Sequence, residues 1–411
     1  MHLLSLPGME KKLKLGIIRE GKFPPDSRVA ITPEQCKLIQ QRFPEIEITV
    51  QHSHGRCFND SEFKAAGFPV QEDISDCDVL IGVKEVPIEL LIPGKTYLFF
   101  AHVIKKQAHN KPLIRALLDK KIRLIDYECL RDADGNRVIA FGRWAGIVGA
   151  YNAFYTWGKR TGDFNLKRAK DYKDYKALKH SYTKIILPPI KIVLTGTGRV
   201  AQGSMEVLNA LKIQQVSNSD FLTTKYPHPV FTVLDTNAIY DRISDGGYER
   251  KEFHTKPELY KSIFLPYAKQ CDIMINAIYW NPKAARLFEK TDMHHPDFNM
   301  QVIADISCDV NGGVPATLNN TTINDPVFGY NMHTDKATAP YETDTIDIMA
   351  IDNLPNELPR DASEEFGNLL INNVIAELLK TDSRMIYEAT ICADGKLNTP
   401  YLYLKDYAGE E

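Results

Sequence analysis

Lys84, His102 and Glu128 each follow a short, largely apolar run of residues. Such runs are typical of strands buried on both faces of a parallel sheet. Because ligand sites in these sheets form at the carboxyl ends of the strands, we expect the three side chains to gather at one sheet edge. Taken singly, a lysine there is usually solvated and a histidine is usually a satisfied core residue. Together they predict an acid–base site, since neighbouring titratable groups shift one another's pKa and pass protons.

Three cationic residues lie near these predicted strand ends. Arg28 belongs to the segment Asp26-Ser27-Arg28-Val29-Ala30, and Lys105 and Arg137 follow further along the chain. A guanidinium in this position could bind a substrate carboxylate with two parallel hydrogen bonds, and Asp26 could orient it. The alternative for each is a surface ion pair, which contributes little energy.

A glycine-rich turn starts the second half of the chain. Residues 196–203 read Gly-Thr-Gly-Arg-Val-Ala-Gln-Gly, after a predicted strand at residues 191–195 and before a predicted helix. Gly196 permits the tight turn and Gly198 lets a pyrophosphate approach the backbone, while Ala201 or Gly203 allows close packing of the helix on the sheet. The pattern predicts a dinucleotide whose phosphates lie at the helix N-terminus.

Asp235 supports the dinucleotide and indicates which one. It ends the next predicted core strand, residues 230–234, where a carboxylate would bond the ribose hydroxyls and disfavour the 2′-phosphate of NADP. The gap from the glycines is longer than usual, and the insertion at residues 214–229 accounts for it. We therefore expect NAD, with NADP less favoured. The alternative is a solvated loop carboxylate.

The elements that position these residues alternate between strand and helix. Thr32, Pro33 and Gln35 predict a helix start with a capping box. The alternation restarts at Lys191, the strand signals stop past about Asp335, and residues 362–379 predict an amphipathic helix that returns to the first domain. We expect an α/β protein of two Rossmann-like domains, with parallel sheets flanking a cleft. The expected substrate domain is residues 9–146 with 338–411, and the expected NAD-binding domain is 147–337.

Composition excludes several other classes of protein. The 411 residues carry a net charge of −3, which predicts no attraction to nucleic acid or an anionic membrane. No apolar run reaches the roughly 18–20 residues that span a bilayer. The cysteines number seven, are scattered and form no CxxC, which favours reduced thiols in the cytoplasm and no metal site. The first eight residues are too short for a signal peptide, and we leave them out of the fold.

The chain resembles the lysine-forming saccharopine dehydrogenases and, more closely, the lysine–ketoglutarate reductase half of animal aminoadipic semialdehyde synthase. The resemblance runs over nearly the whole chain and is weakest at residues 163–186 and 214–229. It is carried by segments in both halves: residues 15–20, 27–33, 82–84, 99–102 with Lys105, 124–128, 137–146, 195–198, 276–280, 305–307, and 351–355 with 358–360.

The resemblance implies a reaction that interconverts saccharopine, NAD(P)+ and water with L-lysine, 2-oxoglutarate and NAD(P)H. Lys84 would take the proton of the secondary amine, His102 would assist attack of water on the imine, and Glu128 would tune both. Residues that would bind the substrate are Arg28, Lys105, Arg137 and Phe141, and residues that would bind the cofactor are Gly196, Gly198, Arg199, Val200, Asp235, Ile278 and Tyr279.

The sequence departs from the animal reductases at Asp235, where they lack the acidic residue and use NADPH; the carboxylate again favours NAD. The chain also ends without their second dehydrogenase half, so we expect it to work with a separate enzyme.

Two rival functions stay open. One is alanine dehydrogenase, a relative whose catalytic histidine lies in a Tyr-Leu-His-Leu-Ala context, whereas here Phe100-Ala101-His102 is followed by Val103-Ile104-Lys105-Lys106. The additional cations favour a substrate with more carboxylates than alanine. The other is a non-catalytic nucleotide-binding regulator, which would be expected to have lost some of Lys84, His102 and Arg28.

Overall fold

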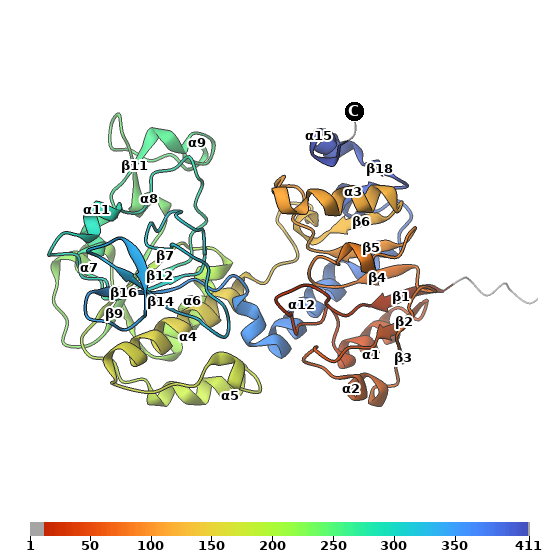
Figure 1. Ribbon diagram of the computed structural model, residues 1–411, viewed down its shortest axis with the longest axis horizontal. Coiled ribbons are helices and arrows are strands. Elements are labelled where there is room, and N and C mark those ends of the chain that lie inside the picture. The colour runs from red at the N-terminus through yellow and green to blue at the C-terminus, as the bar shows by residue number, and fades with distance from the viewer. Residues whose placement is uncertain (1–11, 410–411) are drawn as a thin grey trace, which may run out of the picture. The chain divides into compact units, whose positions relative to one another are not determined.

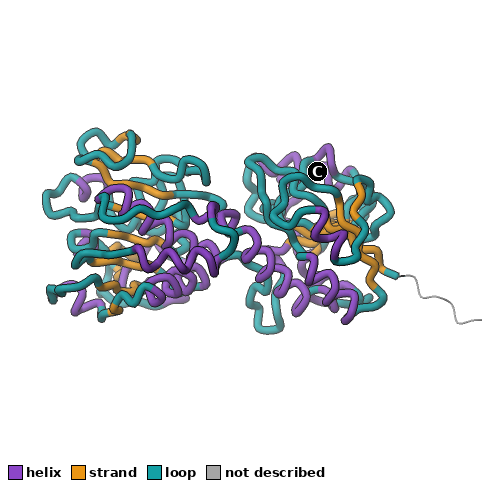
Figure 2. The backbone as a smooth tube through the Cα atoms, turned by 90° about the horizontal axis from the view of Figure 1, so that it is seen from below, coloured by secondary structure: helices purple, strands orange, loops and turns teal. Residues whose placement is uncertain are grey.

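The computed structural model describes residues 12–409, which divide into two compact units (Figures 1 and 2). Unit 1 contains the residues up to Ala140 together with those from Pro359 onward, and unit 2 is Phe141–Leu358. The last segment of the chain thus returns to the first unit, as expected. The domain start that we placed at residue 9 lies outside the described residues.

The sheet of unit 1 has the strand order β18-β17-β6-β5-β4-β1-β2-β3 in the described part of the chain. All pairings from β6 to β3 are parallel, whereas β17 and β18 are antiparallel. Figure 1 shows β6, β5, β4 and β1 lying in this order. The strands are β1 (Leu13–Ile17), β2 (Ile46–Gln51), β3 (Val70–Gln71), β4 (Val79–Ile81), β5 (Thr96–Phe99), β6 (Arg123–Asp126), β17 (Thr390–Ala393) and β18 (Lys396–Leu397).

The helices of unit 1 are α1 (Pro33–Arg42), α2 (Asp60–Ala65), α3 (Lys111–Asp119), α12 (Pro359–Asn373), α13 (Ile375–Leu378), α14 (Arg384–Ala389) and α15 (Lys405–Ala408). The predicted capping box at the start of α1 is confirmed: Thr32 accepts from the amide of Gln35, and the Gln35 side chain accepts from the amide of Thr32. Gln35 also donates to Asn368 on α12 at 2.9 Å, so the returning helix is fastened to the first helix of the chain.

The sheet of unit 2 has the order β15-β14-β16-β13-β12-β7-β9-β8, and its core from β16 to β8 is parallel. Its strands are β7 (Lys191–Thr195), β8 (Gln214–Gln215), β9 (Val230–Leu234), β12 (Ile273–Asn276), β13 (Val302–Asp305), β14 (Phe328–Asn331), β15 (Lys336–Thr338) and β16 (Thr345–Met349). A separate hairpin pairs β10 (Tyr240–Arg242) with β11 (Tyr260–Ser262). The helices are α4 (Gly142–Thr161), α5 (Tyr175–Lys179), α6 (Arg199–Ala210), α7 (Asn218–Thr223), α8 (Thr236–Ile239), α9 (Arg250–Thr255), α10 (Leu265–Ala268) and α11 (Lys290–Met293). Both units have mostly parallel sheets, so the expected α/β class is confirmed.

The units divide at residues 140/141 and 358/359 rather than at the expected 146/147 and 337/338. At the first division, α4 begins at Gly142 and packs along α6 of unit 2. At the second, β16 pairs in parallel with β13. The sheet therefore continues past about Asp335, where the sequence pattern predicted the last strand to end. The fully buried Asp347 interrupts the apolar pattern of β16, and Arg160 matches its charge at 3.0 Å.

Two glycines allow α4 and α6 to approach closely. A Cβ on Gly146 would lie 1.8 Å from the carbonyl oxygen of Val200, and one on Gly203 would lie 2.0 Å from that of Arg143. The role we expected for Gly203, close packing on the sheet, is therefore wrong: its missing side chain makes room for another helix, while Ala201 is the buried neighbour.

Gly203→Ala is expected to destabilise the protein by about 3 kcal/mol, because backbone atoms cannot move aside as side chains can. The measurement is the urea midpoint of unfolding. Gly55→Ala is the matched control, since a Cβ there meets nothing within 4 Å. Equal midpoints for Gly203→Ala and the unmodified protein would contradict this account of the helix pair.

None of the helices within residues 12–409 combines the length and the apolar composition that crossing a bilayer requires. All seven cysteines lie in the described part of the chain, and each is a free thiol.

Candidate active site

Four adjacent parallel strands of unit 1 end beside one another, and each is followed by a titratable side chain. Glu20 follows β1, Lys84 follows β4, His102 follows β5 and Glu128 follows β6. The registers Ile17–Ile81–Leu98–Ile125 fix these ends at one edge of the sheet. The structure therefore brings the three residues singled out from the sequence to one edge and adds Glu20.

Glu128 lies among three basic side chains. Its carboxylate is 3.4 Å from Nδ1 of His102, 3.5 Å from Nζ of Lys105 and 3.8 Å from the guanidinium of Arg137. Burial by itself would raise the pKa of Glu128, but its hydrogen bond and charge interaction with His102, and the charges of Lys105 and Arg137, outweigh burial and lower the pKa to about 2. Glu128 is therefore a permanent anion at neutral pH.

The imidazole of His102 is held in one orientation by its surroundings. Its backbone is left-handed, with φ of 54°, which is uncommon for a residue other than glycine and is found at functional sites. The ring stacks on Phe100 with centroids 6.1 Å apart, and Nδ1 faces Glu128. Within residues 12–409 Nε2 has no hydrogen-bond partner, and the side chain is 27% exposed, so this nitrogen is open to a reactant.

Lys84 is fixed through hydrogen bonds to its backbone, whereas its ammonium group forms no ion pair in the described part of the chain. Glu20 accepts the amides of Val83 and Lys84 at 2.7 and 2.8 Å, while the described residues offer the ammonium group no hydrogen bond or ion pair. Burial, and then the charges of Arg28 and Lys22, lower the pKa of Lys84. A lysine with a lowered pKa is a better base near neutral pH.

Glu20 is the residue that sequence reasoning missed. Burial, followed by the charge of Asp26, raises its pKa to about 8, although the two amides it accepts and Arg28 act in the opposite direction. The signal available in the sequence was a carboxylate shortly after the first strand, at the position that Lys84 occupies after β4. We had expected Glu128 to tune both bases. Within the described residues it contacts His102, and no hydrogen bond or ion pair joins it to Lys84.

Arg28 is placed differently from Lys105 and Arg137. Its guanidinium forms a bidentate pair with Asp26 at 3.0 and 2.5 Å, and both side chains are only 2% exposed. Asp26 orients it as expected, but burial and the matched charge favour a role in holding the loop and lowering the pKa of Lys84. Lys105 is 59% exposed, and Arg137 is 35% exposed with its guanidinium 5.5 Å from the ring of Phe100.

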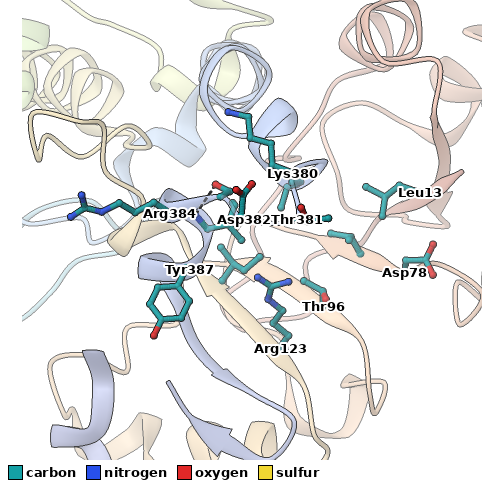
Figure 3. A pocket seen from close by; sticks show the side chains of 14 residues that line it. Leu13, Asp78, Thr96, Arg123, Lys380, Thr381, Asp382, Arg384 and Tyr387 are labelled. Atoms are coloured by element: carbon teal, nitrogen blue, oxygen red, sulfur yellow. Dashed lines mark hydrogen bonds between the residues drawn. The ribbon is translucent and has the colours of Figure 1, made fainter. Parts of the chain in front are cut away.

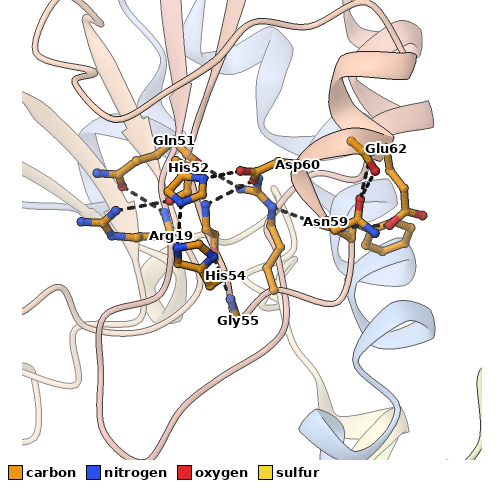
Figure 4. A network of polar contacts seen from close by, with 12 residues as sticks. Arg19, Gln51, His52, His54, Gly55, Asn59, Asp60 and Glu62 are labelled. Atoms are coloured by element: carbon orange, nitrogen blue, oxygen red, sulfur yellow. Dashed lines mark hydrogen bonds and ion pairs between the residues drawn. The ribbon is translucent and has the colours of Figure 1, made fainter.

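A polar network follows β2 in the chain (Figure 4), and contacts from the same region and from α12 support the loop that carries Arg28. Asp60 binds both His52 and Arg56, and His52 Nε2 lies 3.0 Å from His54 Nε2. The amide of Cys57, in the same loop, donates to the carbonyl of Ser27 at 2.7 Å. From the returning helix α12, Ser363 accepts the amide of Val29 at 2.9 Å. The last segment of the chain therefore fixes a loop near its beginning.

The glycine turn of unit 2 has the geometry that a dinucleotide needs. Gly196 has φ of +90°, and a Cβ there would lie 2.9 Å from the carbonyl of Ala277 and 3.4 Å from Cα of Ile278. A Cβ on Gly198 would meet nothing within 4 Å, so the approach to the backbone is open. The helix α6 begins at Arg199 without a side-chain cap, which leaves its first amides able to bind phosphate. Val200 follows in its first turn, and Tyr279 is 81% exposed beyond β12.

Asp235 lies beside this turn. The strands β7 and β9 place Thr195 opposite Leu234, and the amide of Gly196 donates to the carbonyl of Leu234 at 2.7 Å. Asp235 is exposed, and one of its carboxylate oxygens caps α8 by accepting the amide of Ala238 at 3.0 Å. It thus has a structural role in addition to the expected ribose contact.

One of the expected substrate-binding residues, Phe141, does not belong to the same unit as the others. Phe141 belongs to unit 2, where it precedes α4, and it stays a prediction as a substrate contact. No group of three or more His, Cys, Asp or Glu side chains in residues 12–409 is arranged to hold a metal ion.

Comparison with known proteins agrees with these features. Residues 16–148 match the family described as "Alanine dehydrogenase/PNT, N-terminal domain". The chain is 31% identical to the mitochondrial alpha-aminoadipic semialdehyde synthase of Mus musculus, over 97% of this chain and 48% of that protein. It is 24% identical to the saccharopine dehydrogenase [NAD(+), L-lysine-forming] of Schizosaccharomyces pombe, over 87% of this chain and 92% of that protein. The chain thus spans about half the length of its semialdehyde synthase relatives. The resemblance seen in the sequence is confirmed.

A solved structure titled L-alanine dehydrogenase superposes with a TM-score of 0.64 and 14% identity, covering 96% of this chain and 99% of that one. At this identity the superposition shows a shared two-domain fold.

Proposed function

We propose that this chain interconverts saccharopine, NAD+ and water with L-lysine, 2-oxoglutarate and NADH. The observation that carries the proposal is the single sheet edge that holds the lysine base Lys84 and the His102–Glu128 pair, with Lys105 and Arg137 around them. The names of relatives that match most of the chain support it. A cytoplasmic location fits seven free thiols.

The glycine turn fits the dinucleotide. Gly196 and Gly198 would let the pyrophosphate approach, the first amides of α6 would bind it, and Asp235 would bind the adenosine ribose. When bound, NAD+ supplies the hydride acceptor for the carbon beside the secondary amine.

Lys84 would act first in the oxidation. Its lowered pKa increases the fraction of neutral amine at a given pH, and a neutral amine can take the proton of the substrate's secondary amine. Glu20 fixes the backbone of Lys84 by accepting two consecutive amides, so the ammonium nitrogen is free of structural contacts within the described residues.

His102 would act in the hydrolytic half of the reaction. With Nδ1 directed at Glu128, Nε2 is available to take a proton from water as it adds to the imine carbon, and to return it to the departing amine as the carbinolamine collapses. Glu128, ionised at neutral pH, stabilises the imidazolium that forms between these two steps.

The substrate carboxylates would bind the more exposed cations. Lys105 and Arg137 lie 3.5 and 3.8 Å from Glu128, which is long for a charge-assisted hydrogen bond. A carboxylate arriving from solution could therefore bind Lys105 without displacing a short ion pair. Saccharopine has three carboxylates, which suits several cations at one site.

The test of substrate is oxidation of NADH, followed by absorbance, with lysine and 2-oxoglutarate supplied singly and together. Turnover is expected only with both. Turnover with pyruvate and ammonia, and none with lysine, would instead make the chain an alanine dehydrogenase. No turnover with either pair, in a protein that binds NADH, would favour the non-catalytic regulator.

Asp235 is expected to set the cofactor preference, with kcat/KM at least tenfold higher for NADH than for NADPH. Asp235→Ser should narrow this gap about tenfold, because it removes the charge that repels a 2′-phosphate. Serine is also a good helix N-cap, so α8 should keep its start. Asp235→Asn is the second neutral variant and should behave alike. An unmodified protein that prefers NADPH would contradict the assignment.

A further inference from the structure

A pocket of about 610 Å³ opens at the opposite edge of the unit 1 sheet from Lys84 and His102 (Figure 3). It is formed by the first residues of β1, β4, β5 and β6 and by the segment 378–387 of the returning chain. The pocket lies wholly within unit 1, and its volume is in the range of small-molecule sites. β5 runs from Thr96 at the pocket to Phe99 near His102, about 10 Å at ~3.3 Å per residue, so the two sites are separate.

Two charged side chains of opposite sign line this pocket. Within residues 12–409 Arg123, at the start of β6, makes no side-chain hydrogen bond or ion pair, and Asp382 makes none either. Figure 3 shows both among the residues that surround the pocket. Partial burial lowers the pKa of Arg123, while the charge of Asp394 opposes that change. Arg123 and Asp382 are both exposed, so each is open to the opposite charge of an arriving ligand.

The other charged groups of the pocket are already matched. Arg384 pairs with Glu388 at 2.7 Å and Lys380 with Glu377 at 2.6 Å. Asp78 accepts the amide of Lys14 at 3.0 Å. The two charged groups that remain are one cation and one anion, which suit a ligand that carries both an anionic and a cationic group.

The remaining lining is largely aliphatic and would face the ligand's side chain. It comes from three strands and from the returning segment: Leu13, Val79, Ile125, Leu378 and Ile386. We propose that this pocket binds a free aliphatic L-α-amino acid, with Arg123 on the carboxylate, Asp382 on the ammonium group and the aliphatic residues around the side chain. This site is independent of the proposed reaction, because Lys84, His102, Lys105, Glu128 and Arg137 are not among its lining residues.

The experiment is calorimetric titration of the full chain with L-leucine, L-isoleucine, L-valine and L-methionine, without NADH or 2-oxoglutarate. At least one is expected to bind saturably with a Kd of about 1 mM or tighter. The same amino acid as its amide, which lacks the carboxylate, and as its deaminated acid, which lacks the ammonium group, should each bind at least tenfold more weakly. Absence of saturable binding by all four amino acids would overturn the proposal.

Variants locate the binding. Arg123→Gln and Asp382→Asn should each weaken it at least tenfold, whereas Arg42→Gln, an exposed arginine on α1, should leave it unchanged. Lys105→Gln separates this pocket from the proposed active site. Binding that survives Arg123→Gln and is lost in Lys105→Gln would place the amino acid at the active site and overturn the proposal, whatever the outcome of the lysine and 2-oxoglutarate assay.

Discussion

Lys84→Met is expected to lower turnover of saccharopine by a factor on the order of 10²–10⁴, because it removes the proposed base of the oxidation. Lys84→Arg should be as inactive, since arginine keeps the charge but does not lose its proton near neutral pH. An activity that Arg restores would instead make Lys84 a binding site for a substrate carboxylate. Affinity for NADH should stay within about twofold, because the glycine turn belongs to the other unit.

The loss is expected to occur in a folded protein. The pKa of Lys84 is lowered in the folded state, so the unfolded state binds this proton more tightly and stability falls as pH drops below the ordinary pKa of lysine. Removing the charge therefore relieves a cost, and the urea midpoint of Lys84→Met at pH 7 should not decrease. Lys64→Met, on the exposed face of α2, is the control for the substitution itself. Near-normal turnover in a folded Lys84→Met would show that the active site lies elsewhere.

The same lysine sets the expected pH dependence. The proposed oxidation needs neutral Lys84, so its rate should rise with pH through the pKa of this group. Because that pKa is lowered, the rise should be centred below the ordinary lysine value. A rise that stays unchanged in Lys84→Met would belong to another group.

His102→Asn is expected to lower turnover by a similar factor on the order of 10²–10⁴, since it removes the group that moves protons to and from water. Asparagine is the preferred replacement because it tolerates the left-handed backbone at this position, whereas glutamine would add strain. His109→Asn, at an exposed position, is the matched control. The double variant with Lys84→Met should lose much less than the product of the two single losses, because residues that act as a unit are not additive.

Glu128→Gln tests the partner of His102 through the pH profile. Glu128, with a pKa of about 2, is ionised over the whole pH range in which the enzyme is assayed, so its own titration does not appear in the pH–rate profile. Removing its negative charge takes away the anion that stabilises the imidazolium of the proposed mechanism, so one side of the pH–rate profile should move to lower pH. The maximum rate should change less than in His102→Asn. An unshifted profile would show that the 3.4 Å contact does not govern proton transfer.

The sequence by itself determined the class of the fold and the sheet edge at which Lys84, His102 and Glu128 gather. Lys84, His102 and Glu128 follow runs that had to be buried strands, and parallel strands have one direction, so their carboxyl ends had to meet. The turn at Gly196 was equally local, because a glycine with positive φ between a strand and a helix is specified by neighbouring residues. Such features depend on periodicity and backbone stereochemistry, which short stretches of sequence contain.

Tertiary structure decided which of these residues are partners. It paired the carboxylate of Glu128 with the imidazole of His102. It also placed Glu20 where its carboxylate accepts the amide of Lys84, 64 residues away in the sequence, because β1 and β4 are neighbouring strands. The fold also buries the ion pair of Arg28 and Asp26, and it includes β16 in the second sheet although this strand contains the charged Asp347. Gly203 faces α4 rather than the sheet. Each outcome depends on which surfaces meet and how much water they exclude. Burial and long-range contacts of this kind set pKa values and partners, and no local pattern of residues encodes them.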